Sequence, residues 1–274
     1  MMKRNNFPFS AVLGLNHAKT AILIVLVNPR AGGLLISGPR GIGKSTLMRS
    51  TQELIERPWR DIPVSVTEDR LFGTIDTEKA IYSGQKKLYP GIINEADQGV
   101  LYLDDANLLR EDLLDSILNI AEVGAYQLER DGLSLRCDTS FTVIAAINPE
   151  SGMLSGACLD QFGLFVNVDN IHDENTRVEI LKRTISFEKD CASFCKLWKL
   201  ENEKIKKAIH SAMSLLPKVV VSSAMIQLAS VYALKAHVSG HRADIYLIEA
   251  ARALAALAAV SYTHLRAHET KANL

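Results

Sequence analysis

The sequence predicts an α/β domain with a mostly parallel sheet, followed by an all-helical domain. Two observations carry this fold class. Up to about Val168, short apolar segments alternate with segments of three- and four-residue apolar spacing, as strands and helices do in parallel sheets. From Asp173 onward only helical spacing is found. The expected α/β domain is residues 1–170, and the expected helical domain is residues 171–260.

The composition sets limits on the class of protein. Of the 274 residues, 47% are hydrophobic and 23% are charged, which supports a large core beneath a polar surface. Lys and Arg number 31, as do Asp and Glu, so the basic surplus typical of nucleic-acid binding is absent. The apolar run Ala21–Val27 is far shorter than the ~20 residues needed to span a bilayer. We expect a cytoplasmic protein that binds neither nucleic acid nor membranes.

The elements can be expected in chain order. Apolar runs bounded by turn residues predict strands, and three- and four-residue spacing predicts helices. The Asp131-Gly132 pair lies between alternating flanks and predicts a hairpin. The strands are expected over 34–37, 62–66, 99–103, 141–147 and 163–168. The helices are expected over 18–27, from the end of "GPRGIGKST" to about 56, and over 108–123, 174–187, 202–215, 222–237 and 243–260.

The stretch "GPRGIGKS" fits the phosphate-binding pattern G-x-x-x-x-G-K-[ST] at every position. Its glycines let backbone amides converge on phosphate oxygens, and the following helix adds positive potential at its N-terminus. Lys44 can reach the β- and γ-phosphates, and the Ser45 hydroxyl can coordinate Mg²⁺. The candidate nucleotide-binding residues are Gly38, Pro39, Arg40, Gly41, Ile42, Gly43, Lys44, Ser45 and Thr46.

Two adjacent carboxylates follow a buried strand in "GVLYLDDANLL". One interpretation is a strand that ends at the surface, with Asp105 capping the next helix. The phosphate loop favours the other interpretation, because this fold requires a second, acidic strand end. Asp104 is then the candidate Mg²⁺ ligand together with Ser45. Asp105 occupies the place of a general base that polarises the attacking water.

With both motifs placed, the chain resembles the AAA+ ATPases, and among them the ATPase (I-type) subunit of magnesium chelatase. The resemblance covers about Phe7 to Val260. It is carried by "FPFSAVLGLNHAKTAILIVLVNP", "GPRGIGKST", "TEDRLFGTIDTEKAI", "GVLYLDDANLL", "LERDGLSLR", "NPESG", "LDQFGLFVNV" and "GHRADIYLIEAARALAAL". It implies a P-loop NTPase domain of three αβα layers and a helical lid.

The resemblance also implies cofactors and partners. Such subunits bind ATP and Mg²⁺ and form rings, which we expect here to be homo-oligomeric and hexameric. They work with a second ATPase-like subunit that carries a metal-adhesion domain, and with a large porphyrin-binding subunit. The complex inserts Mg²⁺ into protoporphyrin, and cobalt-inserting relatives exist.

Further site residues follow from the resemblance. Asn148 matches the sensor that orients the lytic water, and Arg242 matches the second sensor, which reaches the nucleotide from the lid. Each has a plainer interpretation, because Asn148 precedes Pro149 in a turn and Arg242 could be a solvated helix start. "LERDGLSLR" matches the pre-sensor hairpin, and residues 73–91 match the helix-two insertion.

Two positions depart from the family pattern. The family has an Asp-Glu pair where this chain has Asp104-Asp105, so Asp105 is one methylene shorter toward the water. The family has Arg where this chain has Gln161. That Arg acts on the γ-phosphate of the neighbouring subunit, and such fingers are worth about 10³–10⁵ in rate. Gln161 can donate a hydrogen bond but cannot neutralise the developing charge.

Three functions are therefore compatible with the sequence. The first is an active ATPase motor that couples hydrolysis to metal insertion into a tetrapyrrole. The second is a nucleotide-binding ring subunit that hydrolyses ATP slowly or not at all, which Asp105 and Gln161 favour. The third is a related AAA+ chaperone that loads metalloproteins.

The last residues, 261–274, do not continue the apolar stripe of the preceding helix. His264, His268 and Glu269 could suggest metal ligands, but the glutamate placement of a zincin helix is missing. The stretch also resembles read-through into a sequencing adapter. We expect a non-native tail, frayed or loosely helical, that adds nothing to stability, with the lid truncated at Val260.

Overall fold

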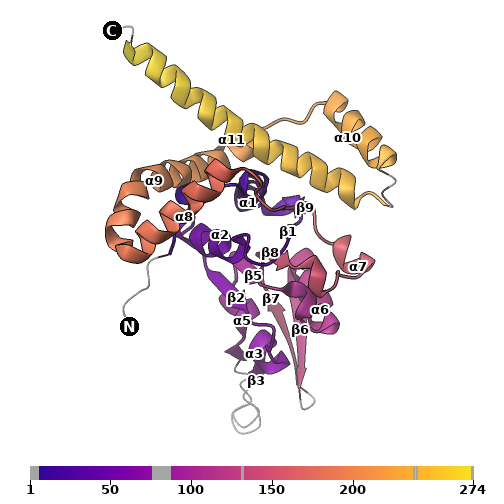
Figure 1. The fold of residues 1–274 in the computed structure, drawn as a ribbon. Coiled ribbons are helices and arrows are strands. Elements are labelled where there is room, and N and C mark those ends of the chain that lie inside the picture. Colours follow the sequence, from indigo (N-terminus) through magenta and orange to yellow (C-terminus); the bar gives the residue numbers. More distant parts are fainter. Residues whose placement is uncertain (1–5, 76–87, 131–132, 237, 239, 273–274) are drawn as a thin grey trace.

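The computed structural model describes residues 6–75, 88–130, 133–236, 238 and 240–272, the last twelve as helix backbone only. At its centre is a five-stranded sheet in the order β2-β5-β8-β1-β9 (Figure 1). Every neighbouring pair of strands is parallel, which confirms the predicted sheet. The strands are Trp59–Ile62 (β2), Gly99–Leu103 (β5), Phe141–Ile147 (β8), Leu34–Ser37 (β1) and Leu164–Asn167 (β9).

Helices and two hairpins complete the α/β part. Each hairpin is an antiparallel pair outside the central sheet, β3 with β4 and β6 with β7. The second pair is the predicted hairpin, although its turn at 131–132 lies outside the described residues. The helices are Asn16–Val27 (α1), Lys44–Thr51 (α2), Glu68–Phe72 (α3), Ile92–Glu95 (α5), Glu111–Val123 (α6) and Gly156–Leu159 (α7), and the hairpin strands are Gly73–Ile75 (β3), Leu88–Pro90 (β4), Ala125–Arg130 (β6) and Leu133–Asp138 (β7).

Successive side chains of the central strands pack on opposite faces of the sheet, as the twofold period of a strand requires. Leu34 and Tyr102 join one buried cluster with α1 and α2. Leu35 and Leu101 join a second cluster with α6. The three inner strands β5, β8 and β1 are therefore buried on both faces, which explains why they are continuous apolar runs in the sequence. This arrangement is the predicted three-layer αβα sandwich.

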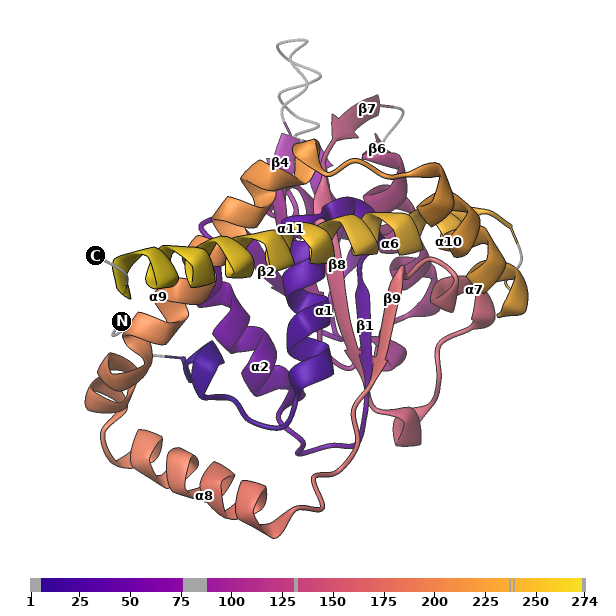
Figure 2. The same ribbon diagram turned by 90° about the horizontal axis from the view of Figure 1, so that it is seen from above.

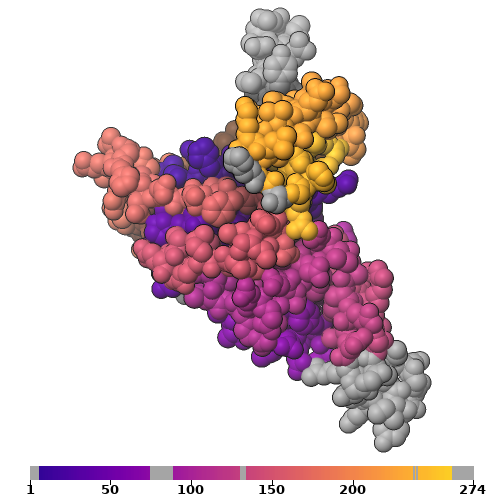
Figure 3. All heavy atoms as spheres, turned by 90° about the vertical axis from the view of Figure 1, so that its right-hand side faces the viewer, coloured from indigo at the N-terminus to yellow at the C-terminus, as the bar shows by residue number. Residues whose placement is uncertain are grey.

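The helical part follows β9. It comprises Glu174–Lys189 (α8), Cys191–Leu215 (α9), Ser223–Lys235 (α10) and Arg242–Ala272 (α11). Figure 2 shows α11 lying across α1, and α11 also contacts α9 and α10. In Figure 3 the orange α10 and the yellow start of α11 form a lobe that stands out from the α/β part. No single helix among the described residues is long and apolar enough to cross a membrane, although the bent pair of helices 191–218 and 223–235 passes that test jointly.

Three sequence expectations need correction. The strand expected over 62–66 is β2, Trp59–Ile62, and residues 63–66 instead form a turn in which the Val66 amide donates to the Pro63 carbonyl. Proline cannot donate to a sheet ladder, so the pairing ends there. Helix α9 begins at Cys191 rather than near Asn202. Helix α11 continues to Ala272, past the expected end at Val260, because residues 261–272 contain no Pro or Gly to end it; a helical tail is one of the two forms expected for this segment.

A buried polar network fixes α11 to the α/β part. The Asn28 side chain, which is only 2% exposed, donates from Nδ2 to the Glu249 carbonyl at 3.0 Å and to Glu249 Oε2 at 2.7 Å. Arg252 Nη1 donates to both carboxylate oxygens of Glu249, at 3.1 and 2.9 Å. Its Nη2 donates to the Leu216 carbonyl. The Glu249 carboxylate therefore joins the end of α1 to the lid.

We predict that Glu249→Ala lowers the free energy of unfolding by about 2–3 kcal/mol, because it leaves a largely buried guanidinium without its carboxylate. Chemical denaturation followed by circular dichroism measures the change. The matched control is Glu201→Ala, which removes an exposed partner of Lys204 at the same i,i+3 spacing and should cost less than about 0.5 kcal/mol. Equal effects of the two substitutions would contradict the assigned role of Glu249.

Candidate active site

The carboxyl ends of three adjacent strands bring the candidate residues together. The phosphate loop follows β1, Asp104 and Asp105 follow β5, and Asn148 follows β8, which lies between the other two strands. Parallel pairing places all three ends at one edge of the sheet, which is where open α/β sheets bind ligands. The Gly38 amide donates to the Ile147 carbonyl at 3.2 Å, so the loop begins directly beside Asn148.

The glycines of the phosphate loop meet local constraints. A Cβ atom at Gly38 would lie 2.4 Å from Val168 Cγ2 and 2.5 Å from the Val168 carbonyl oxygen, so no larger residue fits there. Gly43 has φ of 98°, in the region that favours glycine, immediately before α2 begins at Lys44. The loop therefore turns sharply and presents the N-terminus of α2 at the carboxyl edge.

Lys44 is held inside the loop. Its ammonium donates to the Gly38 carbonyl at 2.6 Å and to the Pro39 carbonyl at 2.9 Å, and the residue is only 7% exposed. Burial lowers the pKa of Lys44, while the charges of Asp105 and Asp104 act in the opposite direction. A cation enclosed by two carbonyls and faced by two carboxylates can exchange those carbonyls for phosphate oxygens.

Ser45 and Asp104 form an oxygen-donor pair suited to Mg²⁺. Ser45 Oγ donates to Asp104 Oδ1 at 3.2 Å, which links α2 directly to the end of β5. Hydroxyl and carboxylate oxygens are the ligands that Mg²⁺ prefers, so these residues fit the ion. The Tyr102 hydroxyl also donates to Asp104 Oδ1, at 2.9 Å. The only sign of this contact in the sequence is a phenol within an apolar run.

Asp105 has φ of 50°, one of two positive φ values at described residues other than glycine. An L-residue adopts this conformation at a cost, which Asp tolerates better than most. Its side chain makes no capping hydrogen bond to the short helix that follows, Ala106–Leu108. The alternative interpretation of Asp105 as a side-chain cap is therefore wrong, and its charge instead acts on Lys44, whose pKa it raises.

Asn148 is 2% exposed and is held by its own loop. Its Oδ1 accepts from the Glu150 amide and its Nδ2 donates to Ser151 Oγ, both at 3.3 Å. Asn107, three residues after Asp104, donates from Nδ2 to the Asn148 carbonyl at 3.2 Å, and its Oδ1 is buried without a hydrogen-bond partner in the described structure. Sequence reasoning missed Asn107, which joins the acidic loop to the Asn148 loop.

Arg242 and Gln161 lie at the opposite edge of the sheet. Arg242 pairs with Glu122 at the end of α6, at 2.6 and 2.9 Å, and shares a surface cleft with Gln161. Tyr246, one turn further along α11, packs against Gly32, which lies before β1. Since β1 has four residues, the two edges are at least about 10 Å apart. The structure thus places Arg242 away from the phosphate loop of its own chain, and the expected contact of this residue with a nucleotide stays a prediction.

The segment expected to hold the helix-two insertion is mostly outside the described residues, which omit 76–87. The residues on either side of this gap pair as the antiparallel strands β3 and β4, in which Ile75 lies opposite Leu88. The pre-sensor hairpin β6–β7 starts at the end of α6. Neither hairpin contributes a described residue to the group around Lys44 and Asp104.

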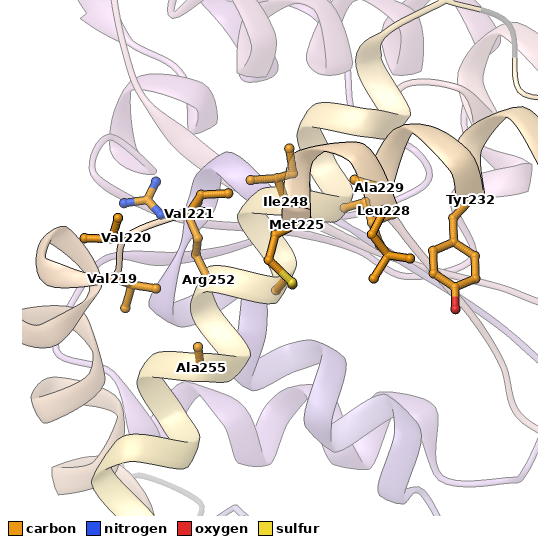
Figure 4. Close-up of a pocket in the computed structure, with 12 residues that line it drawn as sticks. Val219, Val220, Val221, Met225, Leu228, Ala229, Tyr232, Ile248, Arg252 and Ala255 are labelled. Carbon is orange, nitrogen blue, oxygen red and sulfur yellow. The ribbon is translucent and has the colours of Figure 1, made fainter. Parts of the chain in front are cut away.

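A second concavity lies between α10 and α11, with a volume of about 220 Å³ (Figure 4). Val219, Val220 and Val221 line one side, and Leu228 and Tyr232 of α10 line the other. Its single charged lining residue, Arg252, already pairs with Glu249. This apolar pocket has no free cation for phosphate among its described lining residues, so the carboxyl edge is the better nucleotide site.

The phosphate loop, the acidic strand end and the helical lid define an ATPase of the AAA+ class. The family model described as "AAA domain (dynein-related subfamily)" matches residues 33–161, and the one described as "AAA lid domain" matches residues 227–263. Proteins of this class use a nucleotide and Mg²⁺.

Several relatives narrow the class. The magnesium-chelatase 38 kDa subunit of Rhodobacter capsulatus is 34% identical over 97% of this chain and 86% of its own length. The magnesium-chelatase subunit ChlI homolog of Methanocaldococcus jannaschii is 33% identical over 93% of this chain and 80% of its own length. A chain from a cryo-EM-based model of the complex between subunits BchI and BchD of magnesium chelatase is 31% identical, with a TM-score of 0.58 over 92% of this chain and 96% of that one. This chain belongs to the family of magnesium-chelatase I-type ATPase subunits.

We predict that Lys44→Ala weakens nucleotide binding at least about tenfold, because a charge-assisted contact to phosphate is worth about 1.5–3 kcal/mol. A fluorescent ATP analogue measures the affinity. The control is Lys204→Ala, which removes an exposed lysine on α9 and should leave the affinity unchanged. Equal affinity of the Lys44→Ala variant and the parent chain would refute the phosphate-loop assignment.

Proposed function

We propose that this chain binds Mg·ATP at the carboxyl edge of its sheet and hydrolyses it as the ATPase subunit of a magnesium-chelatase-like complex. In that complex, hydrolysis is coupled to insertion of a metal ion into a tetrapyrrole. The observation that carries the proposal is the convergence of Lys44, Ser45 and Asp104 within one hydrogen-bonded group. Family membership supplies the expected coupling to metal insertion.

Each residue at this edge has a role in the proposed reaction. The loop amides and Lys44 hold the β- and γ-phosphates, and Ser45 and Asp104 hold Mg²⁺, which would neutralise developing charge on the phosphates. Asp105 polarises the attacking water, and Asn148 orients it. The Asn148 amide can take this role by exchanging its long contacts to Glu150 and Ser151 for the water.

The position of Arg242 and Gln161 supports a ring. Both lie at the amino edge, where they cannot meet the nucleotide of their own chain but can face that of a neighbour. We therefore propose a homo-oligomeric ring in which each nucleotide lies between the carboxyl edge of one chain and the amino edge of the next. A BchD-like subunit is the proposed second partner, since a structural relative is described in a complex of subunits BchI and BchD. A porphyrin-binding subunit is the proposed third.

Slow hydrolysis is the second candidate, and Asp105 is the observation that favours it. The Asp105 side chain is one methylene shorter than the glutamate of the family pattern, and its backbone has a positive φ. Its carboxylate therefore extends less far toward the attacking water. Gln161 donates its amide to the Ala157 carbonyl at 3.5 Å and offers no charge to a neighbouring chain. The subunit would then bind ATP as well as its relatives do but turn it over more slowly.

We predict a low ATPase rate for the parent chain and a higher rate for both Asp105→Glu and Gln161→Arg in the assembled ring. The first substitution extends the base toward the water, and the second restores the charge that is offered in trans. Phosphate release measures both. Gln52→Arg, which adds the same charge at an exposed position outside the site, should leave the rate unchanged. A fast parent, or no gain from either change, would argue against the assigned roles of Asp105 and Gln161.

A further inference from the structure

Tyr102 is a buried residue whose phenol hydroxyl contacts the carboxylate of Asp104. It is 3% exposed, and its side chain lies on the same face of the sheet as α2, within the buried cluster that contains Leu34 and Met48. The twofold period of a strand points residues 102 and 104 to the same face. The hydroxyl of Tyr102 therefore meets Asp104 Oδ1 at 2.9 Å.

The Asp104 carboxylate accepts the hydrogen bond of the Tyr102 hydroxyl, and the Ser45 side chain is the second hydrogen-bonding neighbour of that hydroxyl. The ring of Trp59 lies beside that of Tyr102, with 6.0 Å between centroids, and its indole Nε1 donates to Asp61 instead. A buried tyrosine hydroxyl normally finds a polar partner, and here that partner is the candidate Mg²⁺ ligand. The ring of Tyr102 is held in place by its contacts in the core. Its hydroxyl therefore donates from a fixed position to the carboxylate.

Two hydroxyl groups converge on the same oxygen of Asp104. Ser45 Oγ lies 3.2 Å from Oδ1. Ser45 differs from Tyr102 because it is itself a candidate metal ligand. If the Ser45 oxygen binds a metal ion, the hydrogen bond from Ser45 to Asp104 is weakened or lost. The hydrogen bond from Tyr102 to Asp104 is kept. Hydrogen bonds to ligating carboxylates are a general means of orienting metal ligands.

We propose that Tyr102 is a positioning residue that orients the Asp104 carboxylate for Mg²⁺. The inference rests on the proposed function, since it assigns Asp104 to the metal. It deepens that function by adding a residue that touches neither nucleotide nor metal. The competing explanation is that Tyr102 only fills the core, in which case its hydroxyl has no effect on the ion.

The experiment compares Tyr102→Phe with the parent chain. Binding of a fluorescent ATP analogue is titrated with Mg²⁺, and the same binding is measured in EDTA. We expect the Mg²⁺ concentration at half-saturation to rise about tenfold, within the range typical for loss of a partner of a metal ligand. We expect the affinity in EDTA to change less than about twofold, because Tyr102 does not touch the phosphate loop's own contacts to the nucleotide.

The chain offers a matched control in Tyr126. This second partly buried phenol has its hydroxyl 2.7 Å from both the Phe72 carbonyl oxygen and Asn94 Oδ1, outside the nucleotide site. Tyr126→Phe removes the same atom and should leave the Mg²⁺ midpoint unchanged. Thermal melting of both variants reports any general loss of stability.

A double-substitution cycle tests whether Tyr102 acts through Asp104. In an Asp104→Asn background, Tyr102→Phe should shift the Mg²⁺ midpoint by less than about twofold, because the carboxylate it orients is gone. An unchanged midpoint in the single variant, or an equal shift in both backgrounds, would overturn the proposal while leaving the nucleotide site intact. Absence of Mg²⁺-dependent binding in the parent chain would overturn the proposed function as well.

Discussion

The parallel register of β5, β8 and β1 is the constraint on which the site depends. Leu103 of β5 pairs with Ala145 of β8, and Ile147 of β8 pairs with Ser37 of β1, so three strand ends reach one edge together. An antiparallel partner would send one of these ends to the other edge and separate its residues from the rest. Hydrogen bonds from Gly38 to Ile147 and from Ser45 to Asp104 then close the edge into one site.

The packing of α11 on the α/β part determines which side chains lie at the amino edge of the sheet. Small residues of α11, Ala253 and Ala256, are fully buried and let the helix approach the α/β part closely, while the Glu249 carboxylate ties it to Asn28. Arg242 at the start of this helix is consequently held at the amino edge, against Glu122. The chain therefore presents the phosphate-loop residues and Arg242 on opposite edges of one sheet, and the proposed ring of identical chains would bring the two edges together.

Local patterns made the carboxyl edge predictable from the sequence. The loop glycines, Lys44 and Asp104 each follow from a short motif whose residue types are dictated by phosphate and Mg²⁺ chemistry. The sheet was predictable because buried parallel strands are continuous apolar runs. Even so, the predicted start of β2 was three residues too late. The alternation after Ile62 is typical of a strand, but Pro63 cannot donate to a sheet ladder and ends the pairing.

Features that depend on tertiary packing could not be predicted from the sequence. The place of Arg242 follows from how α11 packs on Gly32 through Tyr246, and no local pattern encodes that contact. In the sequence, Tyr102 is one more residue of an apolar strand. Its hydrogen bond to Asp104 becomes evident only from the structure. Asn107 lies in a loop whose partner, the Asn148 carbonyl, is 41 residues away along the chain.

Mixing two inactive variants tests the arrangement of two partial sites most directly. Lys44→Ala removes the carboxyl-edge contact to the nucleotide, and Arg242→Ala removes the amino-edge contact, so rings of either variant alone should lose ATPase activity. A ring of both contains interfaces at which an intact Lys44 faces an intact Arg242. We expect the mixture to release phosphate faster per chain than either variant alone. A mixture no faster than the average of its two components, or full activity of Arg242→Ala by itself, would contradict a nucleotide site shared between neighbouring chains.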